Sequence, residues 1–144
     1  MTVQVKDSNG NNVNNGGDAV NLTASSGTIA AVTDNNDGTY TAIYTSATTV
    51  GTATITGTLN SIVITDDASI SLKNGATDAG QSVISANPTT LVADGTSTST
   101  ITVQMKDSNG NNVLIGGDTV NLTASSGTIA AVTDNNDGTY TATY

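Results

Sequence analysis

Residues 2–44 read TVQVKDSNGNNVNNGGDAVNLTASSGTIAAVTDNNDGTYTAIY, and residues 102–144 repeat this stretch with five changes. The changed pairs are Val5/Met105, Asn14/Leu114, Asn15/Ile115, Ala19/Thr119 and Ile43/Thr143. The other 38 of the 43 positions are identical, which excludes coincidence. An offset of 100 residues is too long for a solenoid repeat and matches the length of a whole domain. The sequence therefore predicts near-identical domains in tandem.

The residues within each repeat favour strands and turns. Thr, Val, Ile, Ser, Asn and Gly dominate, and there is no Glu or Arg. β-branched residues suit a pleated sheet, while Asn, Asp and Gly supply turns. Period-2 alternation predicts these inward residues: Val3 and Val5; Val20, Leu22 and Ala24; Tyr40, Ala42 and Tyr44; Ala53, Ile55 and Leu59; and, in the second copy, Ile101, Val103 and Met105. We predict an all-β, immunoglobulin-like β-sandwich in tandem repeats of about 100 residues.

The outer strands set the expected domain boundary. A strand is predicted near Ile29–Val32, and a strand or strand pair across Ile62–Leu72. Val83–Val92 reads as an edge strand broken at Pro88. We expect residues 1–80 to be one domain lacking its first strand and residues 81–144 to be the N-terminal part of the next. The central strands would then occur twice. Such a chain would be a segment of a longer array of repeats, or a subunit whose sandwich is completed by strands of a neighbouring copy.

The net charge and the absent residue types argue against several classes of function. Twelve aspartates against three lysines give a net charge of −9. This argues against nucleic acid and anionic membranes, which attract Lys and Arg. Without His, Cys or Glu, the usual nucleophile–base pairs cannot form, so no catalytic residue and no enzyme are expected. No apolar run suits a membrane helix and no signal peptide follows Met1, so any export signal is expected outside this stretch.

A calcium loop is the one metal hypothesis. Side chains at calcium-loop spacing are Asp7, Asn9, Asn11, Val13, Asn15 and Asp18, but Asn12 stands where such a loop needs glycine. Asp66, Asp67 and Asp78 are a second hypothesis, for stiffening a junction. We favour ordinary turns and predict no cofactor and no metal residue, with calcium kept as the alternative.

Four other features have a structural interpretation. Tyr40 and Tyr44 are expected to be core residues rather than a carbohydrate platform. Lys6 and Lys106 alternate with inward residues and should face water, which excludes an intramolecular Lys–Asn bond. Asn21 and Asn121 head N-glycosylation sequons but should simply face outward from a strand. Leu114 and Ile115 replace two asparagines in a loop, so we expect them in an interface with another domain or chain.

Three segments of the second repeat carry a family resemblance. They are Ser85–Asn111, the Gly-Gly-Asp-x-Val-x-Leu segment that ends at Leu122, and DNNDGTY at Asp134–Tyr140. Together they resemble the bacterial immunoglobulin-like domains of the invasin and intimin adhesins, and the third also resembles filamin-type repeats. Residues 45–72 fit the closing part of the same domain.

The resemblance implies an extracellular segment on the bacterial cell surface. The leading expectation is a structural spacer in an adhesin stalk or fibre, with neighbouring repeats as partners and strand-completing contacts with other copies. The alternative is an adhesive module whose loops contact a receptor, a glycan or a neighbouring cell. No nucleic acid partner and no membrane insertion of this segment are expected.

Overall fold

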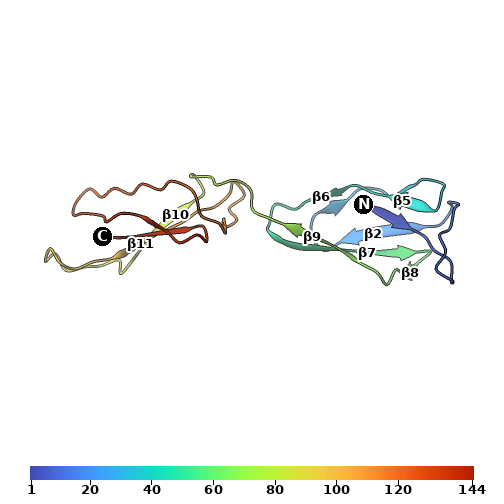
Figure 1. Cartoon of the computed structure of the whole chain (residues 1–144), viewed down its shortest axis with the longest axis horizontal. Helices are drawn as coiled ribbons and strands as arrows, with labels where there is room; N and C mark the ends of the chain where they lie inside the picture. Colours follow the sequence, from blue (N-terminus) through green and yellow to red (C-terminus); the bar gives the residue numbers. More distant parts are fainter. The chain divides into compact units, whose positions relative to one another are not determined.

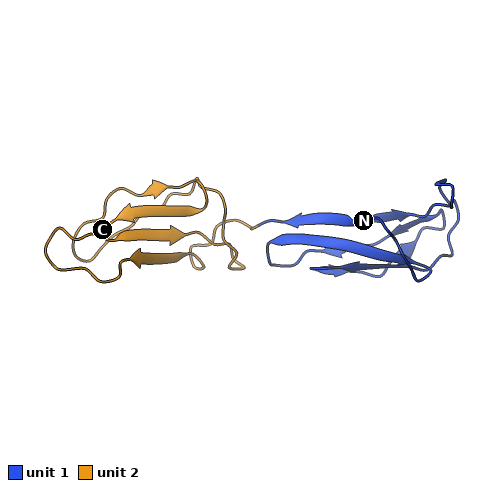
Figure 2. Cartoon of the chain, turned by 90° about the horizontal axis from the view of Figure 1, so that it is seen from below, with its two compact units in different colours: residues 1–73 blue, residues 74–144 orange.

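The computed structural model describes all 144 residues and contains strands, turns and loops without any helix. It divides into two compact units, Met1–Lys73 and Asn74–Tyr144 (Figure 2). The predicted all-β class is confirmed. Residues 74–80 were expected in the first domain but belong to the second unit.

The first unit is a small sandwich. Its strands are β1 (Thr2–Gln4), β2 (Val20–Ala24), β3 (Thr28–Ile29), β4 (Thr33–Asp34), β5 (Thr39–Thr41), β6 (Tyr44–Thr45), β7 (Gly51–Leu59), β8 (Ile62–Val63) and β9 (Ala68–Leu72). One sheet has the order β1-β5-β4, and another has the order β2-β7-β8 with β9 also on β7. β3 and β6 form a separate pair. The long strand β7 lies beside β2 in Figure 1.

The core of this unit joins the two larger sheets. Val5, Val20 and Tyr40 are buried together, with Val3, Val13, Leu22, Val32 and Leu59 packed against them. Ala53 and Ile55 of β7 are also buried, whereas Ile43 is 73% exposed. The predicted alternation is confirmed for these positions. Of the stretch predicted as a strand at Ile29–Val32, only Ile29 belongs to a strand, as the end of β3, and the residues up to β4 form an irregular connection.

The second unit has a single four-stranded sheet. Its strands are β10 (Val83–Asn87), β11 (Thr100–Gln104), β12 (Thr133–Asp134) and β13 (Thr139–Thr143), in the order β10-β11-β13-β12. Val103, Met105, Val113 and Tyr140 are buried on one face, and Val120, Leu122 and Val132 pack against them. β10 ends at Asn87, directly before Pro88, so the predicted edge strand is shorter than Val83–Val92.

Identical residues fold differently in the two units. Residues 20–24 form β2 because they pair with residues 55–59 of β7, and this second unit has no counterpart of β7. Residues 120–124 differ from them at no position, yet they form no strand. The expectation that all central strands occur twice is wrong for this strand, because a strand needs a hydrogen-bonded partner.

Candidate functional site

In the loop with calcium-like spacing, the carboxylate of Asp7 accepts hydrogen bonds from its own turn. Asp7 Oδ1 accepts hydrogen bonds from the backbone N–H groups of Asn9 and Asn11, at 2.9 and 2.8 Å. Asn11 Nδ2 donates to Asp7 Oδ2 at 3.0 Å. This last bond contributes most to lowering the pKa of the Asp7 carboxyl below its ordinary value. Both oxygens of Asp7 therefore stabilise the turn to which they belong.

The remaining positions of the calcium spacing point elsewhere. The side chain of Val13 packs in the core, and its carbonyl oxygen accepts a hydrogen bond from Gln4 Nε2 at 3.1 Å. Asn15 Nδ2 donates to the Gly16 carbonyl. Asp18 Oδ1 accepts a hydrogen bond from Asn60 Nδ2 at 2.7 Å. The loop thus does not converge on a cation, and no three acidic side chains gather anywhere in the chain.

The three aspartates of the second calcium hypothesis are also not brought together. Asp66 and Asp67 lie between β8 and β9 in the first unit, whereas Asp78 belongs to the second unit. Asp78 Oδ1 accepts a hydrogen bond from Gly80 N at 2.8 Å. Asp78 thus has a local structural role within the second unit.

The Gly-Gly-Asp segment and the DNNDGTY segment, two of the motifs that carry the family resemblance, are in contact. Gly117 N donates to Asp134 Oδ2 at 2.8 Å, and Asp118 N donates to the hydroxyl oxygen of Tyr140 at 2.8 Å. The first repeat has the same two bonds, from Gly17 to Asp34 and from Asp18 to Tyr40. Tyr40 and Tyr140 are each 1% exposed. The Gly-Gly-Asp segment is therefore held by the strand pair that carries DNNDGTY, and these tyrosines are core residues.

Other predicted outward residues are found outside the core. Asn21 and Asn121 are exposed. Lys6 is exposed, and Lys106 Nζ donates to the Gly110 carbonyl at 3.1 Å. Leu114 and Ile115 are 65% and 69% exposed in their loop. This pair is a compact apolar surface that the first repeat lacks.

Asp107 differs from its copy Asp7 in burial. Asp107 is 1% exposed, whereas Asp7 lies on the surface. Oδ2 of Asp107 accepts the backbone N–H of Gly75 at 2.9 Å, and the carboxylate also accepts from Asn111 Nδ2. The Asn111 side chain, followed by Gly75, lowers the pKa of Asp107 to about 2, against the opposing effect of burial. The segment that begins at Asn74 covers this carboxylate.

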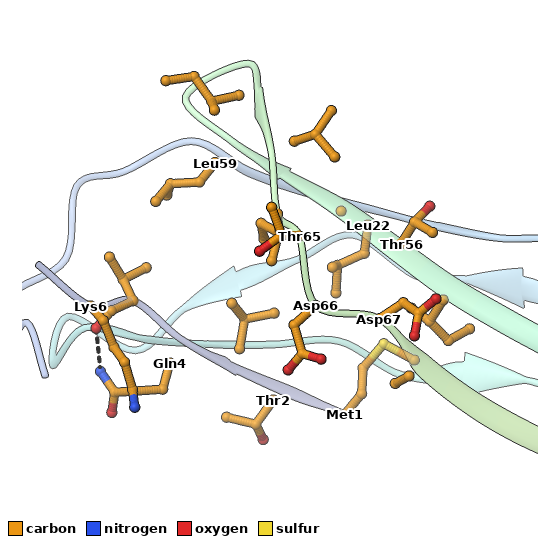
Figure 3. A pocket seen from close by; sticks show the side chains of 18 of the residues that line it. Met1, Thr2, Gln4, Lys6, Leu22, Thr56, Leu59, Thr65, Asp66 and Asp67 are labelled. Atoms are coloured by element: carbon orange, nitrogen blue, oxygen red, sulfur yellow. Dashed lines mark hydrogen bonds between the residues drawn. The ribbon is translucent and has the colours of Figure 1, made fainter. Parts of the chain in front are cut away.

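A groove of about 790 Å³ in the first unit was not predicted from the sequence. It runs along β1 and is closed on the far side by the chain from β7 through β8 to β9 (Figure 3). Met1, Leu22 and Leu59 contribute apolar side chains, and Asp66 and Asp67 also line the groove. The sequence feature that could have indicated this groove is the apolar pair Ile62-Val63 directly after the Asn60-Ser61 turn. In the structure both side chains are at least 70% exposed.

The solved structures that this chain resembles include bacterial surface proteins of the invasin type. The chain resembles the crystal structure of invasin, a bacterial integrin-binding protein, with 30% identity, a TM-score of 0.67 and coverage of 99% of this chain and 29% of that one. It resembles InvD of Yersinia pseudotuberculosis with 33% identity and a TM-score of 0.66, over 98% of this chain and 42% of InvD. FdeC, an Escherichia coli adhesin, shares the fold at 24% identity, with a TM-score of 0.55 and coverage of 99% and 48%.

The relatives confirm the predicted immunoglobulin-like fold and the expected bacterial cell-surface location. The chain spans less than half the length of each of these three proteins. It contains no helix that could serve as a membrane span. The family described as invasin domain 3 matches residues 1–75 and again residues 78–144, so each unit is matched separately. The chain therefore belongs to the invasin domain 3 family.

Proposed function

We propose that the chain is a spacer segment in the stalk of a bacterial surface adhesin, without catalytic activity. The observation that supports this role is the internal use of its polar loops. Asp34 and its copy Asp134 accept hydrogen bonds from the same partners in each repeat, Gly17 and Asn36 in the first and Gly117 and Asn136 in the second. Such loops maintain the shape of a repeat and leave few convergent polar groups for a ligand.

The partners of a spacer are the adjoining repeats. Each unit is proposed to be an incomplete copy of one repeat, since only the second has a strand like β10 and only the first has strands like β7–β9. Strand-completing contacts with other copies would then supply the missing neighbours. An unpaired sheet edge is a ready template for such a contact.

A second candidate function rests on Leu114 and Ile115. Two adjacent apolar side chains, each about two-thirds exposed, form a surface suited to a protein or cell-surface ligand. The first repeat has Asn14 and Asn15 at the same positions. A ligand-binding module would therefore use this loop of the second repeat.

A binding experiment separates the two functions. The purified chain is applied to arrays of glycans and extracellular matrix proteins and to cultured cells. A spacer is expected to give no saturable binding to any of them. The double variant Leu114→Asn/Ile115→Asn and the reciprocal Asn14→Leu/Asn15→Ile are the matched pair. Saturable binding that the first variant abolishes would overturn the spacer role in favour of the adhesive module.

The same double variant tests the expected interface at this loop. If the pair contacts another domain or chain, replacing it with asparagines should weaken self-association or lower the melting temperature. Unchanged sedimentation and unchanged melting would show that this loop is not an interface between copies.

A further inference from the structure

Strand β2 forms one edge of its sheet and has no strand on its outer side. The sheet order is β2-β7-β8, and β3, the next strand along the chain, pairs with β6 instead. β10, which only the second unit has, pairs with β11, the copy of β1, and so belongs to the other sheet. The open edge of β2 is therefore set by strands that the first unit contains.

The odd-numbered residues in and beside β2 direct their backbone groups toward β7 and the turn that follows it. Ser25 N donates to the Thr54 carbonyl at 2.9 Å, and Asn60 N donates to the Ala19 carbonyl at 2.8 Å. Because this direction alternates along an antiparallel strand, the even-numbered residues present their N–H and C=O groups at the open edge. These are Val20, Leu22 and Ala24.

Three other edge strands of this unit have features that hinder pairing. Natural sheet edges are protected by short strands, charged residues or proline. β4 and β8 have two residues each, and β9 lies between Asp67 and Lys73. β2 has five residues, with no charge, no proline and no glycine among them. It is therefore the edge of these four that is suited to pairing with another strand.

We propose that β2 pairs edge to edge with β2 of a second copy of the chain, antiparallel about a two-fold axis at Leu22. In this register Leu22 lies opposite Leu22, and Val20 lies opposite Ala24 of the second copy. All three open residues are then hydrogen-bonded across the new pair. A shift of the register by two residues would leave one of them without a partner in the strand.

The side chains of β2 match in the same register, because their alternation is symmetric about Leu22. Leu22 packs against the core and is only half-buried in the single unit, so its copy in the second chain covers it further. On the outer face the exposed Asn21 lies opposite the exposed Thr23 of the second copy. An amide and a hydroxyl at opposing positions can hydrogen-bond across the strands.

The charges of the chain lie away from this pairing. A net charge of −9 drives copies apart in general. The charged residue closest to β2 along the chain is Asp18, which lies opposite Ser26 of the second copy in the proposed register. No carboxylate thus faces another across the new pair, and about 0.1 M salt screens charges more than about 10 Å apart.

Self-association of the full chain is the first measurement, by sedimentation velocity at rising concentration in about 0.1 M salt. We expect a reversible dimer, together with slower hydrogen exchange of the Val20, Leu22 and Ala24 amides as concentration rises. A chain that remains monomeric at millimolar concentration would overturn the proposal.

A charge exchange tests the register. Asn21→Lys/Thr23→Lys places lysines opposite lysines and should weaken association about tenfold or more, and Asn21→Asp/Thr23→Asp should do the same. A mixture of the two variants should associate, because each introduced lysine then lies opposite an introduced aspartate. The matched control is Ser69→Lys/Ser71→Lys, at exposed positions of β9, which adds the same charge and should leave association unchanged.

Cysteine cross-linking gives a second readout, since the chain has no cysteine of its own. Positions 21 and 23 form the closer kind of antiparallel pair, with Cα atoms about 4.5 Å apart, which a disulfide can span. Mixed Asn21→Cys and Thr23→Cys chains should therefore give mainly the mixed disulfide. Circular dichroism identifies any variant that fails to fold. Equal effects of the β2 and β9 lysine variants, or no preference for the mixed disulfide, would overturn the proposal.

The inference deepens the proposed stalk function, on which it rests for identifying the second copy as another stalk. The two can fail separately. A chain that binds glycans or matrix proteins and also dimerises through β2 contradicts only the spacer role. A chain that does neither contradicts only the pairing of β2.

Discussion

Replacing Gly38 with alanine should destabilise the first unit far more than replacing Gly10. Both glycines have a left-handed backbone, with φ of 80° and 84°. Alanine pays roughly 1–2 kcal/mol for that conformation. A Cβ at Gly10 meets nothing within 4 Å, whereas a Cβ at Gly38 overlaps the Val13 carbonyl group. Both substitutions therefore carry the cost of the left-handed backbone, and only Gly38→Ala adds a steric overlap.

The additional cost at Gly38 follows from the hydrogen bonds around it. Its carbonyl accepts from Val5 N at 3.0 Å and from Gln4 Nε2 at 3.1 Å, and the Val13 carbonyl accepts from Gln4 Nε2 at 3.1 Å. Separating Gly38 from Val13 disturbs all three bonds, at about 1 kcal/mol each. We expect Gly10→Ala to cost about 1 kcal/mol and Gly38→Ala about 4 kcal/mol, a large part of the stability of a small domain.

Urea denaturation followed by circular dichroism and by amide resonances of the first unit measures both free energies of unfolding. The copies Gly110 and Gly138 provide an internal replicate, because their φ values are nearly the same and an added Cβ meets the corresponding neighbours. Equal losses for Gly10→Ala and Gly38→Ala would refute the reasoning. So would a large loss at Gly38 that is absent at Gly138.

Four further predictions concern single contacts and assembly. Tyr140→Phe leaves Asp118 N without its acceptor and should cost about 1 kcal/mol in urea unfolding; no loss would show that water replaces the hydroxyl. The pKa of Asp107 is lowered from 3.8 to about 2, so its stabilisation is complete above about pH 4 and is lost as pH falls through about 2. Between these pH values the melting temperature of Asp107→Asn should therefore fall less than that of the unchanged chain. Equal falls in melting temperature would contradict this. Millimolar calcium should raise the melting temperature only slightly, since no three acidic groups gather, and a rise of tens of degrees in calorimetry would refute that expectation. A fusion of residues 74–144 to 45–73 should sediment as a stable monomer, because it restores counterparts of β7–β9; aggregation of the fusion would contradict the repeat boundary.

Local patterns were sufficient to predict much of this fold. Alternation identified Val5, Tyr40 and Ile55 as core residues, since a strand with one buried face must alternate. The inward assignment of Ala42 and Tyr44 places Ile43 on the outer face, and Ile43 is indeed exposed. These features depend only on neighbours in sequence and on the pleat.

Features that depend on distant partners could not be predicted. Residues 120–124 have the sequence of a strand but no partner strand. The calcium-loop spacing kept as an alternative includes Val13, but the side chain of Val13 packs in the core and its carbonyl accepts from the amide of Gln4. The groove along β1 arises because two sheets leave one side of the sandwich open, and no single stretch of sequence encodes that opening.

The fastening of residues 74–82 to the second unit has a mechanical consequence. Gly75, Thr77 and Asp78 are held one after another, by Asp107 at 2.9 Å, by Asp118 at 2.7 Å and by the Lys106 carbonyl at 2.7 Å. Under tension applied from the Lys73 end we expect the bond of Gly75, the first of the three along the chain, to break before those of Thr77 and Asp78. Nine released residues add at most about 30 Å of length. We therefore expect this segment to lengthen before any strand of the sheet is pulled out.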